Sequence, residues 1–371
     1  MKKFLALSLA VLMLVTVFAG CGEKKGEEKD TLLIGASGPL TGPAASYGIS
    51  VKQGAELAVE QVNADGGVNG LKLKLEFIDD ENDPQKAGVA YDTLMDKGVQ
   101  ASLGCVTTNP CLTFADKSLV DNLFFITASA SAANVIKNKN GFRVCFGDPD
   151  QGVLAAEELV KTYTNIGVIY DSSTDYSKGV FEAFAAKMDE LGKTYNAKTF
   201  DGDSNRDFST QVAALKDCDV IFLPIYYTEA ALIAQEATKT GCNAVLFGCD
   251  GLDGVAESLK GVTVNNKISY ISPFDVASTD PVSSAFVTAY KAKYGKDPDQ
   301  FAADGYDAIK SLVAAMVKAE VKDANISASD LCNKLYDAYT AKDFSYKGAT
   351  GEMTWDANGA PVKAPIIVEI K

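Results

Sequence analysis

The chain has 371 residues, of which 47% are hydrophobic, and its formal net charge at pH 7 is -14. It contains no histidine, which excludes imidazole metal sites as well as Ser-His-Asp and Cys-His catalytic arrangements. The excess of negative charge argues against nucleic acid and anionic membrane surfaces as partners.

The first 30 residues have the organisation of a bacterial export signal followed by a tether. Two lysines precede an apolar run, Phe4 to Val17, that is too short to cross a bilayer comfortably. The sequence FAGC ending at Cys21 resembles a lipobox, with phenylalanine where leucine is usual. We therefore expect residues 1–20 to be a signal peptide, Cys21 to be lipidated, and residues 21–30 to be a charged tether. An ordinary signal peptide or an uncleaved anchor is the alternative.

From Thr31 onward, apolar runs with strand character alternate with segments of helical spacing. Helical crossovers between apolar strands predict a parallel, doubly wound sheet. The first elements are predicted as strands at Thr31–Ser37, Leu73–Ile78, Ala101–Gly104 and Leu123–Thr127, with helices at Val51–Val62, Gln85–Asp96 and from Pro110.

The same alternation starts again near residue 150. The roughly 350 residues left after export are more than one hydrophobic core usually holds, so we predict an α/β fold of two doubly wound parallel-sheet lobes. The later strands are predicted at Ile166–Asp171, Tyr195–Phe200, Asp219–Pro224, Ala244–Gly248, Ile268–Ser272 and Pro365–Ile370. The later helices are predicted at Gln151–Tyr163, Ser177–Leu191, Phe208–Leu215, from Thr228, Val282–Tyr294, Phe301–Ala319 and Ala328–Tyr339.

Besides Cys21 the chain has seven cysteines, none with CxxC spacing, so neither a zinc site nor a thioredoxin-like centre is expected. One interpretation is that they are small buried hydrophobic residues. Another, in an exported protein, is a disulfide such as Cys242–Cys249 or Cys105–Cys111. The seven are Cys105, Cys111, Cys145, Cys218, Cys242, Cys249 and Cys332.

A series of loop motifs spans nearly the whole mature chain: GPLTG from Gly38, VNADGGVNGLKL from Val62, DDENDP from Asp79, DPDQG, GDSNRDFST, FGCDG and TWD. In this order they are similar to branched-chain amino acid binding proteins, the substrate-binding components of ABC uptake systems, with the type I periplasmic-binding-protein fold. The resemblance implies three hinge crossings, near Gly147, Phe274 and Met353. The lobes are then expected at residues 31–147 plus 274–353 and residues 148–273 plus 354–371.

An amino acid ligand needs hydrogen-bond donors for its carboxylate, and helix amino termini after parallel strands supply them. Thr107 to Pro110 and Ser129 to Ser131 both follow predicted strands. The resemblance places the family's carboxylate-binding hydroxyls on Thr108 and Ser131, whose spacing matches without a gap. Helix capping is the alternative role for these hydroxyls. The family's disulfide cannot form here, because Asn82 and Thr107 occupy its two positions.

The resemblance also assigns the ammonium group of the ligand to Asp250 and the Ser129 carbonyl, although an Asp-Gly pair is often only a turn. Asp304 is a weaker second acid. Tyrosines offer an apolar face and a hydrogen-bonding tip, and Phe301 is an apolar wall. The full expected site is Tyr47, Thr107, Thr108, Ser129, Ala130, Ser131, Tyr176, Tyr226, Asp250, Phe301 and Asp304.

We expect capture by lobe closure, with a branched-chain or other apolar α-amino acid as the ligand and ABC permease subunits as partners. The protein is expected to be a monomer held at the outer face of the cytoplasmic membrane by the lipid on Cys21, without cofactor, metal or nucleic acid. A sensor of the same fold, for an amide or an aromatic or aliphatic carboxylate, is the nearest alternative. A hydrolase using Asp79 and Asp80 is disfavoured because adjacent acids in a turn are usually solvated, and a structural surface protein would not need the site residues.

Overall fold

A computed structural model describes residues 30–202 and 206–370, and the chain from Thr31 onward forms one compact unit. The predicted signal peptide, Cys21 and most of the tether lie outside the described residues. No helix in the described part of the chain is long and apolar enough to span a membrane.

The first sheet is parallel throughout and has the strand order β2-β1-β3-β4-β5. Its strands are β1 (Thr31–Gly38), β2 (Lys72–Asp79), β3 (Ala101–Ser102), β4 (Phe125–Thr127) and β5 (Gly141–Arg143). The helices around it are α2 (Ala45–Ala64), α3 (Pro84–Asp96), α4 (Thr108–Asp121), α10 (Pro281–Tyr294), α11 (Gln300–Lys318) and α12 (Ala328–Tyr339).

Both faces of the first sheet are covered, as side-chain alternation along β1 shows. Leu32 and Ile34 lie in the core formed with α2, α11 and α12. Leu33 packs against the core formed by α3 and α4, which includes Tyr91 and Phe114. Because successive strand residues point to opposite faces, a strand buried on both sides has a continuous apolar sequence, as β1 does.

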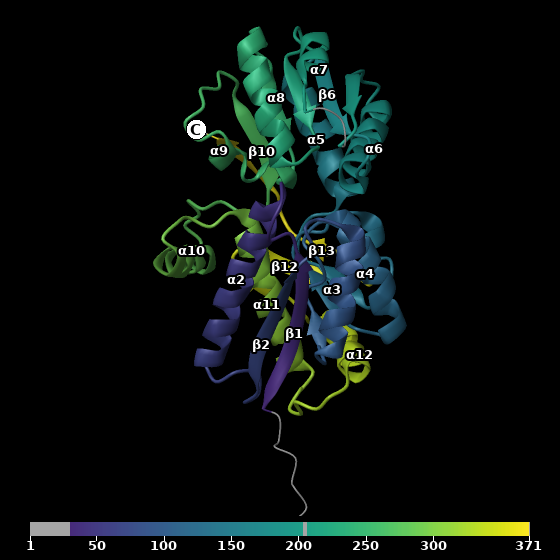
Figure 1. Ribbon diagram of the computed structural model, residues 1–371, viewed down its shortest axis with the longest axis vertical. Helices are drawn as coiled ribbons and strands as arrows, with labels where there is room; N and C mark the ends of the chain where they lie inside the picture. The colour runs from purple at the N-terminus through teal and green to yellow at the C-terminus, as the bar shows by residue number, and fades with distance from the viewer. Residues whose placement is uncertain (1–29, 203–205, 371) are drawn as a thin grey trace, which may run out of the picture. The chain divides into compact units, whose positions relative to one another are not determined.

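Helices α2 and α11 pack side by side with their backbones in contact (Figure 1). A Cβ atom on Gly54 would lie 1.9 Å from the Ala302 carbonyl oxygen, and one on Gly305 would lie 2.4 Å from the Val51 carbonyl oxygen. Glycine is therefore required at both positions. This close crossing brings the first turn of α2 next to the first turn of α11.

The second sheet has the order β14-β10-β9-β8-β6-β7, in which only the pairing of β14 with β10 is antiparallel. Its strands are β6 (Ile166–Asp171), β7 (Asn196–Phe200), β8 (Val220–Leu223), β9 (Val245–Gly248), β10 (Ile268–Ser272) and β14 (Ile366–Ile370). One face packs on α5 (Asp148–Thr162) and α6 (Asp175–Glu190), and the other on α7 (Ser209–Ala214) and α8 (Tyr227–Thr240). The short helix α9 (Val255–Ser258) follows β9.

A small antiparallel sheet was not predicted. It consists of β11 (Tyr346–Gly348), β12 (Gly351–Trp355) and β13 (Pro361–Val362). Trp355 is buried in the core of the first sheet, and its indole nitrogen donates to the Arg143 carbonyl at 2.8 Å. The third crossing between the two sheet regions therefore lies after β13 rather than near Met353.

The predicted α/β architecture with two parallel sheets is confirmed. Strands β6 and β10 and helix α12 begin and end where they were predicted. Strand β3 is shorter than predicted because Gly104 has a φ of 61° and turns the chain out of the sheet. The short β5 carries too few residues for its pattern to be seen in the sequence.

Candidate functional site

Two loops at the carboxyl ends of β3 and β4 carry the predicted hydroxyl residues. Thr107 precedes α4, and Ser129 and Ser131 precede the 3-10 helix η1 (Ala133–Ile136). Neither α4 nor η1 has a side-chain hydrogen bond at its N-cap. The Thr107 side chain therefore does not cap α4.

Hydrogen bonds tie the two loops together. The Thr108 hydroxyl accepts from the backbone nitrogens of Ser131 at 3.3 Å and Ala132 at 3.4 Å, and the Ser129 hydroxyl donates to the Val106 carbonyl at 2.6 Å. The Thr107 hydroxyl is buried and has no partner within the described residues. A buried hydroxyl without a partner costs free energy. A ligand that forms a hydrogen bond with this oxygen would remove that cost.

The second sheet contributes an acid and two tyrosines. Asp250 begins the 3-10 helix η2 (Asp250–Leu252) directly after β9, and Tyr176 lies in the first turn of α6. The Tyr176 hydroxyl donates to Asp250 Oδ1 at 2.8 Å and accepts from the Gly251 nitrogen at 3.1 Å. The ring of Tyr226 stacks on that of Tyr176, with centroids 5.0 Å apart.

Tyr47, in the first turn of α2, connects the two sheet regions. Its hydroxyl donates to the Gly251 carbonyl and accepts from the Tyr227 nitrogen at 3.1 Å. Its ring lies 5.3 Å from that of Tyr226 and 4.5 Å from that of Phe301, measured between centroids. The close crossing of α2 and α11 is what puts Tyr47 and Phe301 in contact.

These residues surround one small cavity. All of the predicted site residues except Ala130 and Asp304 line it. The lining consists of Tyr47, Val106, Thr107, Thr108, Ser129, Ser131, Tyr176, Tyr226, Asp250, Gly251 and Phe301.

The two exceptions are buried elsewhere. Ala130 packs in the core between the first sheet and α3 and α4. Asp304 faces Lys363, with 3.3 Å between its Oδ1 and Nζ, and both side chains are almost fully buried. The same ammonium group donates to the Val144 carbonyl and the Thr350 hydroxyl. Asp304 thus belongs to an ion pair near the third crossing and not to the cavity.

Asp250 is a buried carboxylate without a cationic partner. Burial raises its pKa to about 6, and hydrogen bonds from Tyr176, Gln151 and Gly251 oppose this shift. Within residues 30–202 and 206–370 no lysine or arginine forms an ion pair with it. A charge in such a place needs an opposite charge to offset its desolvation, so the cavity is suited to a cation.

Sequence reasoning missed the two glutamines that hold the Asp250 backbone. Gln151 Oε1 accepts from the Asp250 nitrogen at 3.0 Å, and Gln300 Nε2 donates to the Asp250 carbonyl at 2.8 Å. Gln151 lies in the DPDQG motif and Gln300 immediately precedes Phe301. Their only available signal was their position beside residues already assigned to the site.

Asp148, in the same DPDQG motif, is a further buried acid. Its backbone nitrogen donates to the Ser131 carbonyl at 3.0 Å, but neither of its carboxyl oxygens has a partner among the described residues. Burial, followed by the nearby charge of Asp250, raises the pKa of Asp148 to about 8, whereas Ser131 and Arg143 lower it. Asp148 is therefore largely neutral near pH 7.

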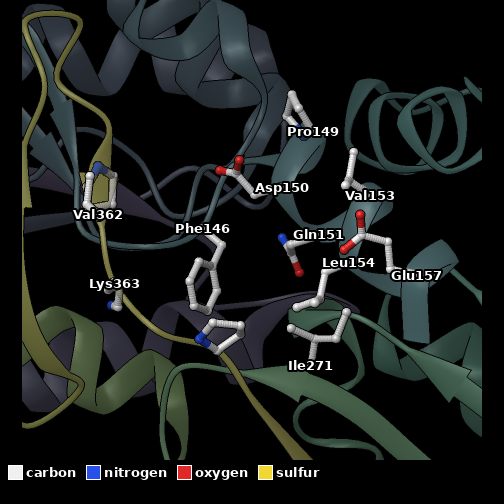
Figure 2. A pocket seen from close by; sticks show the side chains of 12 residues that line it. Phe146, Pro149, Asp150, Gln151, Val153, Leu154, Glu157, Ile271, Val362 and Lys363 are labelled. Carbon is white, nitrogen blue, oxygen red and sulfur yellow. The ribbon is translucent and has the colours of Figure 1, made fainter. Parts of the chain in front are cut away.

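A larger, more open hollow lies between the start of α5 and the segment around Val362 (Figure 2). Its walls are mainly apolar, including Phe146, Leu154 and Ile271. None of the predicted ligand-binding residues lines it. The small cavity around Asp250 is therefore the candidate ligand site.

Comparisons with known proteins agree with this geometry. A sequence profile described as periplasmic binding protein matches residues 31–371. The chain belongs to the periplasmic binding protein family. The Leu/Ile/Val-binding protein BraC3 of Rhizobium johnstonii is 28% identical over 330 residues, which cover 87% of this chain and 89% of the relative.

Two solved structures of the family show the same fold. A leucine-binding protein, LivK of Thermotoga maritima, has a TM-score of 0.82 and 27% identity and covers 92% of this chain and 95% of that one. The branched-chain amino acid binding protein LivJ of Streptococcus pneumoniae, in complex with isoleucine, has a TM-score of 0.82, 26% identity, and coverage of 92% and 96%. The predicted resemblance to branched-chain amino acid binding proteins is confirmed, whereas the roles of individual site residues stay predictions.

Proposed function

We propose that the protein is the extracytoplasmic substrate-binding component of an ABC uptake system and that it binds an apolar α-amino acid in the cavity around Asp250. One observation supports this most strongly. A buried carboxylate that has no cationic partner among the described residues and a group of buried hydroxyls line the same small cavity. A zwitterion of small size complements both ends of this cavity.

The two ends of the ligand have different partners in this proposal. The ligand ammonium pairs with Asp250 and the Ser129 carbonyl, while the carboxylate accepts hydrogen bonds from the loops that contain Thr107, Thr108 and Ser131. The unpartnered Thr107 hydroxyl gains a partner in the complex. Charged hydrogen bonds of this kind stabilise a complex more than neutral ones do.

The wall around the remaining space favours an apolar side chain. Val106 and the rings of Tyr47 and Phe301 supply it, and both ring residues are buried. The related proteins named above are Leu/Ile/Val-binding, leucine-binding and branched-chain amino acid binding proteins. Leucine, isoleucine and valine are therefore the ligands to test first.

Capture by lobe closure agrees with the contacts between the two sheet regions. Tyr227 donates its hydroxyl proton to the Pro43 carbonyl at 2.6 Å, and Thr228 donates to the same oxygen at 3.1 Å. With the contacts of Tyr47, these bonds join the start of α2 to the start of α8. Such bonds form only when the lobes meet, so a ligand that holds the lobes together shifts the equilibrium toward the closed form.

Isothermal titration of the purified protein with leucine, 4-methylpentanoate and 3-methylbutylamine tests the proposal. The second compound lacks the amino group of leucine and the third lacks its carboxylate. We expect leucine to bind and both analogues to bind at least 100-fold more weakly. Strong binding of 4-methylpentanoate would instead support a carboxylate-binding protein of the same fold and would remove the ammonium role from Asp250.

Membrane attachment through Cys21 and a monomeric state belong to the same proposal. Replacing Cys21 with alanine should move the protein from the membrane fraction to the soluble fraction once the signal peptide has been cleaved. The mass of the protein in each fraction shows whether the signal peptide has been removed. Light scattering of the soluble form should give the mass of one chain. Membrane retention of the Cys21→Ala protein after signal-peptide cleavage would contradict the lipid anchor.

A further inference from the structure

Two cysteines stand at either end of the loop that carries Thr107 and Thr108. Cys105 precedes the loop and Cys111 lies in the first turn of α4, and both side chains are buried. The Cys105 backbone nitrogen donates to the Cys111 sulfur at 3.4 Å. Burial, followed by a hydrogen bond with the Cys111 thiol, raises the pKa of the Cys105 thiol well above its usual value.

The local backbone explains why the two thiols meet. Gly104, with a φ of 61°, turns the chain back toward α4, and a Cβ atom at this position would lie 3.4 Å from the Cys111 sulfur. The Cys111 nitrogen donates to the Thr107 carbonyl at 3.1 Å, which closes the first turn of α4. The loop is thus short, and its ends are already side by side.

We propose that Cys105 and Cys111 form an intramolecular disulfide that closes the loop carrying Thr107 and Thr108. The pairing considered from the sequence as its alternative, Cys242 with Cys249, is disfavoured. Cys242 is buried on the face of the second sheet that packs on α8, and Cys249 is buried on the face that packs on α5 and α6. Of the two pairings that the sequence left open, the structure therefore favours Cys105 with Cys111.

The reaction is thiol–disulfide exchange with a small disulfide oxidant such as oxidised glutathione. During refolding, before either cysteine is buried, the Cys105 thiolate attacks one sulfur of the oxidant and displaces glutathione as a thiolate, which takes a proton from solvent. Cys111 then attacks the mixed disulfide and displaces the second one. The two protein thiols lose two electrons and two protons, and the oxidant becomes two molecules of reduced glutathione. Exported proteins meet conditions in which such bonds persist.

Tryptic peptide mapping provides a direct test because residues 98–117 form one tryptic peptide that contains both cysteines. The purified protein is refolded from denaturant in a buffer of oxidised and reduced glutathione, alkylated under denaturing conditions and digested. We expect the 98–117 peptide to carry no alkyl label and to weigh two hydrogen masses less than its reduced form. Two labels on this peptide, or a persistent glutathione adduct on it, would overturn the proposal.

An internal control comes from the peptide of residues 240–260, which contains both Cys242 and Cys249. It should carry two labels in the same sample, and a disulfide there in place of the first would also overturn the proposal. Oxidation should raise the melting temperature of the wild-type protein by several degrees, because a closed loop constrains the unfolded chain. Cys105→Ser should abolish this rise.

Discussion

The Tyr176 hydroxyl donates a hydrogen bond of 2.8 Å to Asp250 Oδ1, across 74 positions of sequence and from a different secondary-structure element. Burial and the charge of Asp250 raise the pKa of Tyr176 well above its usual value, so this tyrosine stays a donor at every physiological pH. The acid is thereby held at the cavity by a neutral partner. Its negative charge remains available to a cationic group.

Ligand affinity should depend on pH through Asp250. Burial raises the pKa of Asp250 to about 6, so the carboxylate is charged above this pH and neutral below it. An ammonium group needs the charged form, and affinity for leucine should therefore fall as the pH drops through 6, by about tenfold per unit below it. Isothermal titration between pH 4.5 and 8 measures this profile.

The matched control is Asp250→Asn, which keeps the shape and removes the titrating charge. We expect it to bind about 100-fold more weakly at pH 7.5, on the order of 3 kcal/mol, and to show no fall in affinity near pH 6. The same pH profile in the variant and in the wild type would show that another group titrates.

Removing the Tyr47 hydroxyl should weaken ligand binding without unfolding the protein. In Tyr47→Phe the buried Gly251 carbonyl and Tyr227 nitrogen lose their shared partner. The expected cost is about 1–3 kcal/mol, and it falls on the closed form because this bond joins the two sheet regions. Titration with leucine measures the loss, and small-angle scattering measures the fraction of compact molecules.

Tyr91→Phe is the control for this substitution. Tyr91 is also buried, but its hydroxyl donates to Asp121 at 2.7 Å within the first sheet region. It should lower stability in denaturant without changing leucine affinity. Equal effects of both variants on affinity would contradict a specific role for Tyr47 in closure.

Asp148 should make the protein less stable as the pH rises. Its pKa is about 8 in the folded state and near 4 in the unfolded chain. Between these values the folded protein holds a proton that the unfolded chain has released, so this contribution to the free energy of unfolding falls with rising pH and levels off above 8. Asp148→Asn should be more stable than the wild type at pH 8.5, by about a few kcal/mol, because it lacks the buried charge. The two proteins should have similar stability at pH 4.

Urea denaturation of the two proteins at both pH values checks this prediction. The quantity to compare is the difference between them, since Asp250 and other buried acids contribute equally to both. A difference that is the same at pH 4 and pH 8.5 would show that the substitution acts through packing and not through the charge.

Breaking the Asp304–Lys363 pair should be strongly destabilising. Both side chains are buried, and Lys363→Met would leave the Asp304 carboxylate without its cation. Removing one partner of a buried pair typically costs about 3–5 kcal/mol. The exposed pair of Lys347 and Asp280 is the control, because Lys347→Met should cost no more than about 1 kcal/mol. Chemical denaturation of the variants gives both values.

The sequence alone was sufficient to predict most of the strand and helix pattern and most of the cavity lining. Strands β1, β6 and β8 are buried on both faces, so their apolar runs are continuous and easily recognised. Tyr47, Thr108, Ser131 and Asp250 were identified from the motifs around them and from a family resemblance. Periodicity by itself gives no reason to bring these four residues together.

Other features depend on contacts between segments far apart in the chain. The antiparallel direction of β14 cannot be read from its sequence, because an edge strand of either direction has the same composition. Asp304 was expected at the ligand, but Lys363, 59 residues later, pairs with it. Gln151 and Gln300 contact the backbone of Asp250 only after the chain has crossed between the two sheet regions.

The sequence by itself determined the alternation of strands and helices, the absence of histidine chemistry and the residue types available for a zwitterionic ligand. These properties are local, since they depend on periodicity and composition. Only the tertiary structure decided which acid remains unpaired in the cavity, which acid pairs with lysine and which two cysteines are adjacent. Those outcomes depend on where helix crossings such as that at Gly54 and Gly305 place distant side chains, and a linear pattern does not contain that information.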